Sequence, residues 1–186
     1  GSENMSMTPY VMRGVRDGWK MMNSQVEDFL MQSLFDAKAG CQIGQTVEHL
    51  AEVYDITREQ ADAAAVAGQQ KSKNAQQKGI YAEEIVPVII RGRHGRETIV
   101  DTDESLRPES TYEGLSCLPG LYGKNGIVTV GNSTGLTDGA AMSVITSGQY
   151  AVDHGLSPLG RIISWGVAGV DPKCMGIGPV TATEKA

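Results

Sequence analysis

This chain of 186 residues has few aromatic residues, no long apolar run and no excess of positive charge. Phe, Trp and Tyr make up 5% of it, so small residues, including 23 glycines, must provide much of its close packing. No apolar stretch reaches the roughly 18 residues that a transmembrane helix needs, and no secretory signal is visible, so we expect no membrane partner. The net charge of −6 argues against a nucleic acid as the main partner.

Cysteine is also rare, and Cys41, Cys117 and Cys174 show neither metal-binding nor redox spacing. We therefore expect no structural disulfide and a reducing compartment. Carboxylates gather at residues 101–104, where they could bind a cation or pair with Arg107. The spacing and the glycine of an EF-hand loop are absent, so we predict no metal site.

What the chain does have is a glycine-bearing turn between two apolar segments. Residues 127–130 predict a short buried strand, residues 131–135 a turn, and residues 138–155 an apolar helix. This order of elements can bring backbone N–H groups and a helix N-terminus close to a ligand. Tight turns that bind nothing show the same pattern, so the residues alone leave both interpretations open.

Hydrophobic spacing and capping signals predict the other elements. They are helices at 25–37, 44–54 and 57–78, a strand at 84–92, a short helix from Ser110 to near Leu118, a strand at 161–167 and a helix that begins at Thr181. Asp17-Gly18 predicts a hairpin within residues 9–24, on which Arg13, Arg16 and Lys20 place positive charge. Such a charged hairpin is most simply a solvated edge.

Both ends of the sequence resemble cut ends. It begins with Gly1-Ser2 and no Met, and Thr181 with Glu184 forms a capping box, which marks the start of a helix. That helix has no room to continue. We therefore expect the chain to be a fragment of a longer protein.

Four further motifs resemble those of the thiolase family and occur in its order. They are Glu-Ile-Val-Pro at 84–87, Asp-Glu-x-x-Arg at 103–107, Gly-Asn-x-x-Gly-x-x-Asp-Gly-Ala-Ala at 131–141 and Met-Gly-x-Gly-Pro at 175–179. The resemblance covers essentially the whole chain and implies the α/β thiolase fold, with this chain as part of a five-layered αβαβα sandwich and its α+β loop domain. In that fold the segments would be residues 1–8 (end of the N-terminal half), 9–125 (the CoA-binding loop domain), 126–155 (return to the N-terminal half) and 156–186 (start of the C-terminal half, truncated).

The resemblance also implies which residues would line a channel for coenzyme A (CoA). Arg107 and Leu118 would contact the adenosine part. The planar guanidinium of Arg107 suits stacking on a purine. Four positions would line the pantetheine arm: Ile43, Tyr122, Val130 and Thr134. Met175 would face the acyl group. The reactive Cys and His motifs of the family match no position of this chain, so we expect no catalytic residue within it.

As the central segment of a thiolase, the chain would serve CoA-dependent acyl transfer, in which acetoacetyl-CoA is formed or cleaved by the intact acetyl-CoA C-acyltransferase. CoA or acyl-CoA would be a substrate, with no permanently bound cofactor, and the fragment alone would be inactive. Its partners would be the remainder of the thiolase chain and further copies in a homodimer or homotetramer. We expect a cytoplasmic protein, with mitochondrion or peroxisome as alternatives.

Two other functions remain open from the sequence. One is a non-catalytic thiolase-like protein that binds acyl-CoA or lipid, or acts as a scaffold. The other, which depends on the residues alone, is a small nucleotide-binding α/β domain. This last hypothesis predicts a continuous parallel sheet within the chain.

Overall fold

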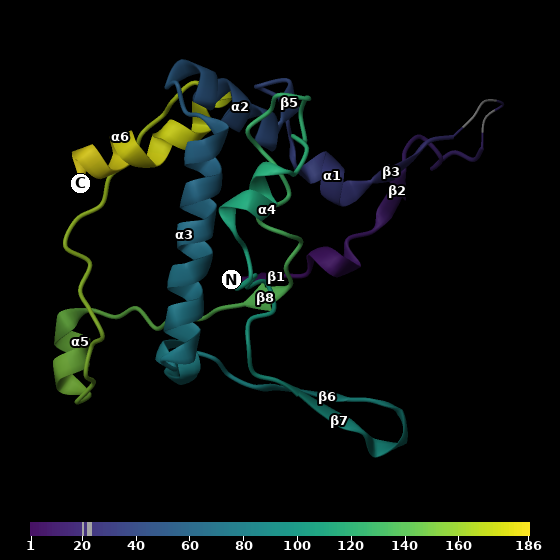
Figure 1. The fold of residues 1–186 in the computed structure, drawn as a ribbon. Helices are drawn as coiled ribbons and strands as arrows, with labels where there is room; N and C mark the ends of the chain where they lie inside the picture. The colour runs from purple at the N-terminus through teal and green to yellow at the C-terminus, as the bar shows by residue number, and fades with distance from the viewer. Residues whose placement is uncertain (20, 22–23) are drawn as a thin grey trace. The chain divides into compact units, whose positions relative to one another are not determined.

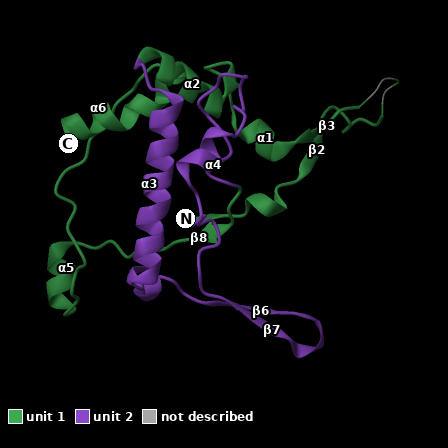
Figure 2. Cartoon of the chain, viewed as in Figure 1, with its two compact units in different colours: residues 1–53, 136–186 green, residues 54–135 purple. Residues whose placement is uncertain are grey.

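The computed structural model describes residues 1–19, 21 and 24–186. These residues form two compact units, one from residues 1–53 and 136–186 and the other from residues 54–135 (Figure 2). Lys20 of the predicted charged hairpin lies outside the described residues.

Helix α3 (Arg58–Gln77) is the longest element of the unit 54–135 (Figure 1). It begins as predicted, because Thr57 accepts a hydrogen bond from the Gln60 backbone N–H while the Gln60 side chain accepts one from the Thr57 N–H. It ends at Gly79, whose φ of +66° is a left-handed conformation that glycine adopts without strain. The predicted helix at 57–78 is thus confirmed.

A hairpin and three short helical segments complete this unit. Strands β6 (Val88–Arg91) and β7 (Glu97–Val100) pair in antiparallel register, with Val88 opposite Val100. Strand β6 begins directly after Pro87, which cannot donate to a ladder, so the strand predicted at 84–92 is confirmed only over Val88–Arg91. The short segments are the 3₁₀ helices η2 (Ile80–Glu83) and η3 (Arg93–Gly95) and helix α4 (Tyr112–Ser116).

The unit 1–53 with 136–186 contains three two-stranded antiparallel sheets. Strand β1 (Ser2–Glu3) pairs with β8 (Gly139–Ala140), β2 (Tyr10–Met12) with β3 (Val26–Asp28), and β4 (Phe35–Asp36) with β5 (Cys41–Gln42). The predicted hairpin around Asp17-Gly18 therefore exists, but its second strand lies beyond residue 24. An ion pair joins Arg13 to Glu27 across it, with 2.9 Å between Nε and Oε2.

The helices of this unit are mostly short. They are η1 (Met5–Met7), α1 (Phe29–Ser33), α2 (Ile43–Val53), α5 (Gly148–Asp153), η4 (Pro172–Ile177) and α6 (Gly178–Lys185). Helix α2 confirms the prediction at 44–54, and it packs against η4.

Two other predicted helices begin at different residues. The helix predicted at 25–37 is wrong at both ends. Residues 26–28 pair as strand β3, Asp28 caps α1 through the N–H groups of Leu30 and Met31, and residues 35–36 pair as strand β4. The helix predicted to begin at Thr181 begins instead at Gly178, where Pro179 supplies the backbone angle that the first turn needs.

Three predicted elements around the glycine-bearing turn are wrong. Residues 127–130 form no ladder, because their backbone groups bond to Leu121, Arg107 and the Asn132 side chain instead of a neighbouring strand. The helix at 138–155 is reduced to α5, because residues 139–140 are extended in β8. Residues 161–167 are not assigned as a strand and have no pairing partner among the described residues.

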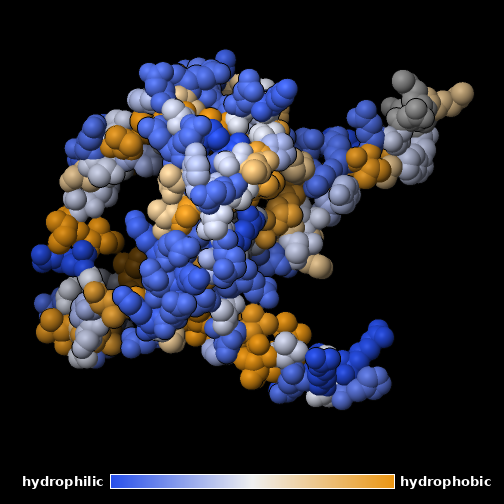
Figure 3. Space-filling view, viewed as in Figure 1, coloured by the Kyte–Doolittle hydropathy of each residue, from blue (hydrophilic) through white to orange (hydrophobic). Residues whose placement is uncertain are grey.

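The four described sheets are all antiparallel pairs, so they do not form the parallel sheet that a small nucleotide-binding α/β domain would need. Few apolar side chains are buried: Ala39, Ala51, Leu115, Val128 and Ala151. Apolar surface is visible in several places in Figure 3. Among the described residues no helix is both long and apolar enough to cross a membrane.

Candidate functional site

The turn at residues 127–135 holds its shape through side chains of its own. The Thr129 N–H donates to Asn132 Oδ1 at 2.8 Å, and Thr129 Oγ1 accepts from the N–H groups of Gly131 (3.2 Å) and Asn132 (3.3 Å). A hydroxyl that accepts from residues two and three positions ahead replaces a backbone turn. Because Thr129 is fully buried, these bonds are shielded from water.

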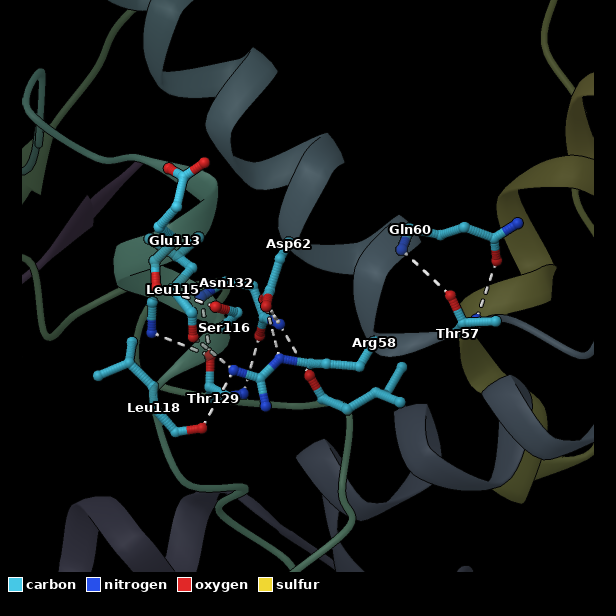
Figure 4. A network of polar contacts seen from close by, with 12 residues as sticks. Thr57, Arg58, Gln60, Asp62, Glu113, Leu115, Ser116, Leu118, Thr129 and Asn132 are labelled. Carbon is cyan, nitrogen blue, oxygen red and sulfur yellow. Dashed lines mark hydrogen bonds and ion pairs between the residues drawn. The ribbon is translucent and has the colours of Figure 1, made fainter.

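Helix α3 fixes the same turn through a buried carboxylate (Figure 4). Asp62 is 0% exposed, accepts from Arg58 Nε at 2.6 Å through Oδ2, and accepts from Asn132 Nδ2 at 2.9 Å through Oδ1. Asn132 Nδ2 also donates to the Ile127 carbonyl at 2.7 Å. Among the described residues, no buried side-chain N or O lacks a hydrogen-bond partner.

The guanidinium of Arg58 continues this network to helix α4. Its Nη2 donates to the carbonyl oxygens of Leu115 (2.5 Å) and Leu118 (3.1 Å), at the end of α4. A planar guanidinium can bind a carboxylate and two carbonyls at once because its donors point in fixed directions. Arg58 therefore ties α4 to α3, and Asp62 ties the turn to both.

The turn also contacts α4 directly. A Cβ atom on Gly131 would lie 2.6 Å from Leu118 Cδ1 and 2.9 Å from Leu115 Cγ, closer than carbon atoms approach. Only glycine lets the backbone of the turn come this near to the two leucines.

A cavity of about 540 Å³ opens beside this turn, within the unit 54–135. Its walls are the face of α3 that carries Gly68, Gln69 and Ser72, residues 79–85 after that helix, the stretch 101–107 and the turn 131–135. This volume falls in the range of sites that bind small molecules. Its wall includes Asp101 and Asp103 of the acidic stretch. Among the described residues, no group of three or more His, Cys, Asp or Glu side chains is arranged to bind a metal ion.

Arg107 stands at the edge of the cavity in a fixed position. Its backbone N–H donates to Gln69 Oε1 at 2.8 Å, and its Nη1 donates to the Val130 carbonyl at 2.7 Å. The guanidinium therefore lies against the turn and remains exposed on its other side. A guanidinium held in this way can stack on a ring or pair with a phosphate at a lower cost in conformational entropy, because its side chain is already ordered.

The structure brings only some of the predicted CoA residues together. Arg107 and Thr134 both line the cavity, and Leu118 lies against Gly131. Tyr122 and Val130 are exposed and do not line it.

The other two predicted residues belong to the unit formed by residues 1–53 and 136–186. Ile43 begins helix α2 and Met175 lies in η4, which packs against α2. The contacts of all seven residues with CoA and its acyl group stay predictions.

Sequence reasoning assigned no role to Arg58, Asp62 or Asn132. One signal was available, because Arg58 and Asp62 are four residues apart and so share a face of the predicted helix. Nothing local indicated that this pair would meet Asn132, 70 residues further along the chain.

The fold and the cavity indicate an α/β protein with a site for a small molecule. Comparison with known proteins identifies its family. Residues 1–149 match the family model described as the N-terminal domain of thiolase. The chain therefore belongs to the thiolase family, which confirms the resemblance seen in the sequence.

Relatives named acetyl-CoA acetyltransferase are similar along the whole chain. The one from Shinella zoogloeoides is 43% identical over 190 residues, which cover 100% of this chain and 47% of the relative. The mitochondrial 3-ketoacyl-CoA thiolase of Mus musculus is 40% identical over 187 residues, with coverages of 100% and 47%. The chain thus spans about half the length of these relatives.

Solved thiolase structures share its fold. The Bacillus anthracis acetyl-CoA acetyltransferase matches with a TM-score of 0.94 and 39% identity, over 100% of this chain and 47% of the other. Human mitochondrial 3-ketoacyl-CoA thiolase matches with a TM-score of 0.93, 38% identity and the same coverages. These values confirm the predicted α/β fold of the thiolases.

Proposed function

We propose that this chain is a segment of a thiolase that transfers acyl groups between CoA thioesters, forming or cleaving acetoacetyl-CoA. Relatives that match the whole chain carry the names acetyl-CoA acetyltransferase and 3-ketoacyl-CoA thiolase. A human relative, 38% identical with a TM-score of 0.91, has been solved in complex with CoA. The observation that carries the proposal is the cavity that Arg107 and residues 131–135 line in a member of this family.

In this proposal the segment supplies part of the CoA channel. Arg107 stacks on the adenine and Leu118 packs beside it, while Ile43, Tyr122, Val130 and Thr134 follow the pantetheine arm and Met175 meets the acyl group. The hydroxyl of Thr134 can contact the amides of pantetheine, because that side chain is exposed at the cavity wall. Residues 1–8 and 126–155 then belong to the N-terminal half of the thiolase, residues 9–125 to its CoA-binding loop domain, and residues 156–186 to the start of its C-terminal half.

The reactive thiolate and its base would come from the rest of the protein. A thiolase nucleophile needs a histidine within hydrogen-bond reach. Cys41, Cys117 and Cys174 match none of the family's reactive motifs. The role of this segment is therefore to bind and orient the thioester, which lowers the entropic cost of the reaction.

The proposed partners are the rest of the thiolase chain and further copies in a homodimer or homotetramer. Exposed apolar side chains support such contacts, because surfaces of this kind are usually covered in an assembled protein. The strands of the β6–β7 hairpin provide one group of them: Val88, Ile89, Ile90 and Ile99. We assign the protein to the cytoplasm, with mitochondrion and peroxisome as alternatives.

Arg107→Ala in the full-length protein tests the CoA contact. We expect the Kd for CoA, measured by isothermal titration calorimetry, to rise about tenfold, since a desolvated cation–ring contact contributes up to about 2 kcal/mol. Arg93→Ala is the matched control: it removes the same charge from an exposed turn of the hairpin. An Arg107→Ala protein that binds CoA as tightly as the Arg93→Ala protein would show that Arg107 does not contact CoA.

A second candidate is a thiolase-like protein that binds acyl-CoA or lipid, or acts as a scaffold, without catalysis. Val130 and Thr134 favour it, because the family's pattern has alanine and serine at these positions, so Val130 adds two methyl groups and Thr134 adds one. Thiolysis of acetoacetyl-CoA, followed by the absorbance of the substrate, separates the two candidates. CoA binding by the full-length protein without turnover would favour the second.

A further inference from the structure

The proposed function gives no role to Asp62, although its charged side chain is fully buried within the unit 54–135. Its side chain is 0% exposed, and that of Arg58 is 20% exposed. Taking two charges out of water is unfavourable unless the geometry is good and the remaining polar groups are bonded. Replacing a buried ion pair by well-packed apolar side chains is often neutral or stabilising. The pair therefore needs an explanation other than stability.

The contacts of Asp62 show what the carboxylate determines. It accepts from Asn132 Nδ2, which orients the amide so that Nδ2 also reaches the Ile127 carbonyl and Oδ1 receives the Thr129 N–H. An amide rotated by half a turn would place its oxygen against the carboxylate. One buried charge thus selects one conformation of residues 127–132.

The partner of Asp62 acts on the other side of the same turn. Arg58 holds the carbonyls of Leu115 and Leu118, and these two leucines form the surface that Gly131 contacts. The turn is consequently fixed through Asn132 and supported through α4. Residues 131–135 of the turn line the cavity.

We propose that Asp62 is a positioning residue for CoA: through Asn132 and Arg58 it sets the shape of the turn 129–135, and thereby the affinity of the cavity for CoA. The inference rests on the proposed function, because CoA is the ligand. Asp62 has no direct contact with the ligand in this role. Its effect reaches the cavity through the turn and through the Val130 carbonyl, which holds Arg107.

An exchange of the two side chains tests this role in the full-length protein. Asp62→Asn places an amide donor against Asn132 or Arg58, and Asn132→Asp faces Asp62 with a second carboxylate. We expect each to raise the Kd for CoA about tenfold, equivalent to about 1.4 kcal/mol. In the double variant, the amide now at position 62 can donate to the carboxylate now at position 132 and still accept from Arg58. We expect this variant to recover most of the affinity, falling short by the lost bond to Ile127.

The measurements are made at a temperature where circular dichroism shows each variant to be folded. Asp55→Asn is the matched control, because Asp55 is exposed in the same unit and its φ of +52° is one that asparagine also accepts. We expect its Kd to equal that of the wild type. The rise should appear in KM for CoA with kcat little changed, as loss of uniform binding predicts.

The outcomes separate the two proposals. A wild-type protein that does not bind CoA overturns the proposed function. A wild type that binds, together with a folded Asp62→Asn variant of equal affinity, overturns the positioning role, and so does a double variant no better than either single one. If Asp62→Asn does not fold, Arg58→Lys replaces it, because lysine keeps the charge but lacks the fork that holds two carbonyls. We expect its Kd to rise severalfold, and an unchanged Kd overturns the role.

Discussion

Gly131→Ala tests the close approach of the turn to α4. The added Cβ would lie 2.6 Å from Leu118 Cδ1, which is the mobile end of its side chain, and 2.9 Å from Leu115 Cγ, which is not. Leu115 is 6% exposed, so it has little room to move. Overpacking of this kind costs about 1–3 kcal/mol. Loss of glycine's freedom in the unfolded chain returns about 0.4–1 kcal/mol, so we expect the free energy of unfolding to fall by about 0.5–2 kcal/mol.

Urea unfolding of the full-length protein, followed by circular dichroism, measures this change. Gly68→Ala is the matched control: it lies inside α3, and a Cβ there meets nothing within 4 Å. We expect it to raise stability by about 0.5–1 kcal/mol, because alanine favours the helix. If Gly131→Ala is as stable as Gly68→Ala, the turn does not depend on this close approach and our reasoning is wrong.

Two smaller contacts give further predictions. Thr57→Ala removes the cap of α3 and should lower the free energy of unfolding by about 1 kcal/mol in urea, whereas Thr57→Ser should be nearly neutral. The pKa of Asp138 lies below its ordinary 3.8 because the hydroxyl and then the backbone N–H of Ser6 donate to its carboxylate. A lowered pKa stabilises the fold above the ordinary value, and this contribution is lost as the pH falls through the lower, folded value. Ser6→Ala should therefore destabilise the protein near neutral pH, and urea unfolding repeated as the pH is lowered below 3.8 should show a progressively smaller difference from the wild type.

Elements with local signals could be predicted from the sequence. Helix α3 has its capping box at Thr57 and Gln60 and its terminating Gly79, all within a few residues of its ends. Helix α2 has an amphipathic face that places Thr46 and Ala51 inside. Such signals act over one or two turns of chain, so they are readable without knowing what else is nearby.

Elements that side-chain bonds or distant partners determine could not be predicted. Residues 127–130 have the composition of a strand, but the Asn132 side chain and the Leu121 N–H bond to their backbone. Residues 139–140 become β8 because residues 2–3 pair with them. In the first place nearby side-chain and turn bonds override the local preference, and in the second a distant strand does.

The candidate site shows the same division. The motif containing Arg107 is readable from the sequence, and so is the turn 131–135. Their relation is not, because Arg107 reaches the turn through the Val130 carbonyl and the turn takes its shape from Asp62, 70 residues before Asn132. Arg107 and Thr134 line the cavity and lie in motifs that the sequence shows, whereas Asp62 lies outside the cavity and reaches the turn only through a contact between distant residues.

In this arrangement, contact with a ligand and control of the turn's conformation belong to different residues. On the cavity side, Thr134 and Arg107 present the groups that a ligand could contact. Asp62 does not line the cavity, but it holds the Asn132 side chain and thereby the backbone of residues 127–132. A change at Thr134 can then alter the fit of a ligand while the turn is kept. A change at Asp62 moves the whole turn, and with it the Val130 carbonyl that holds Arg107, so its effect and that of Arg107→Ala should be coupled.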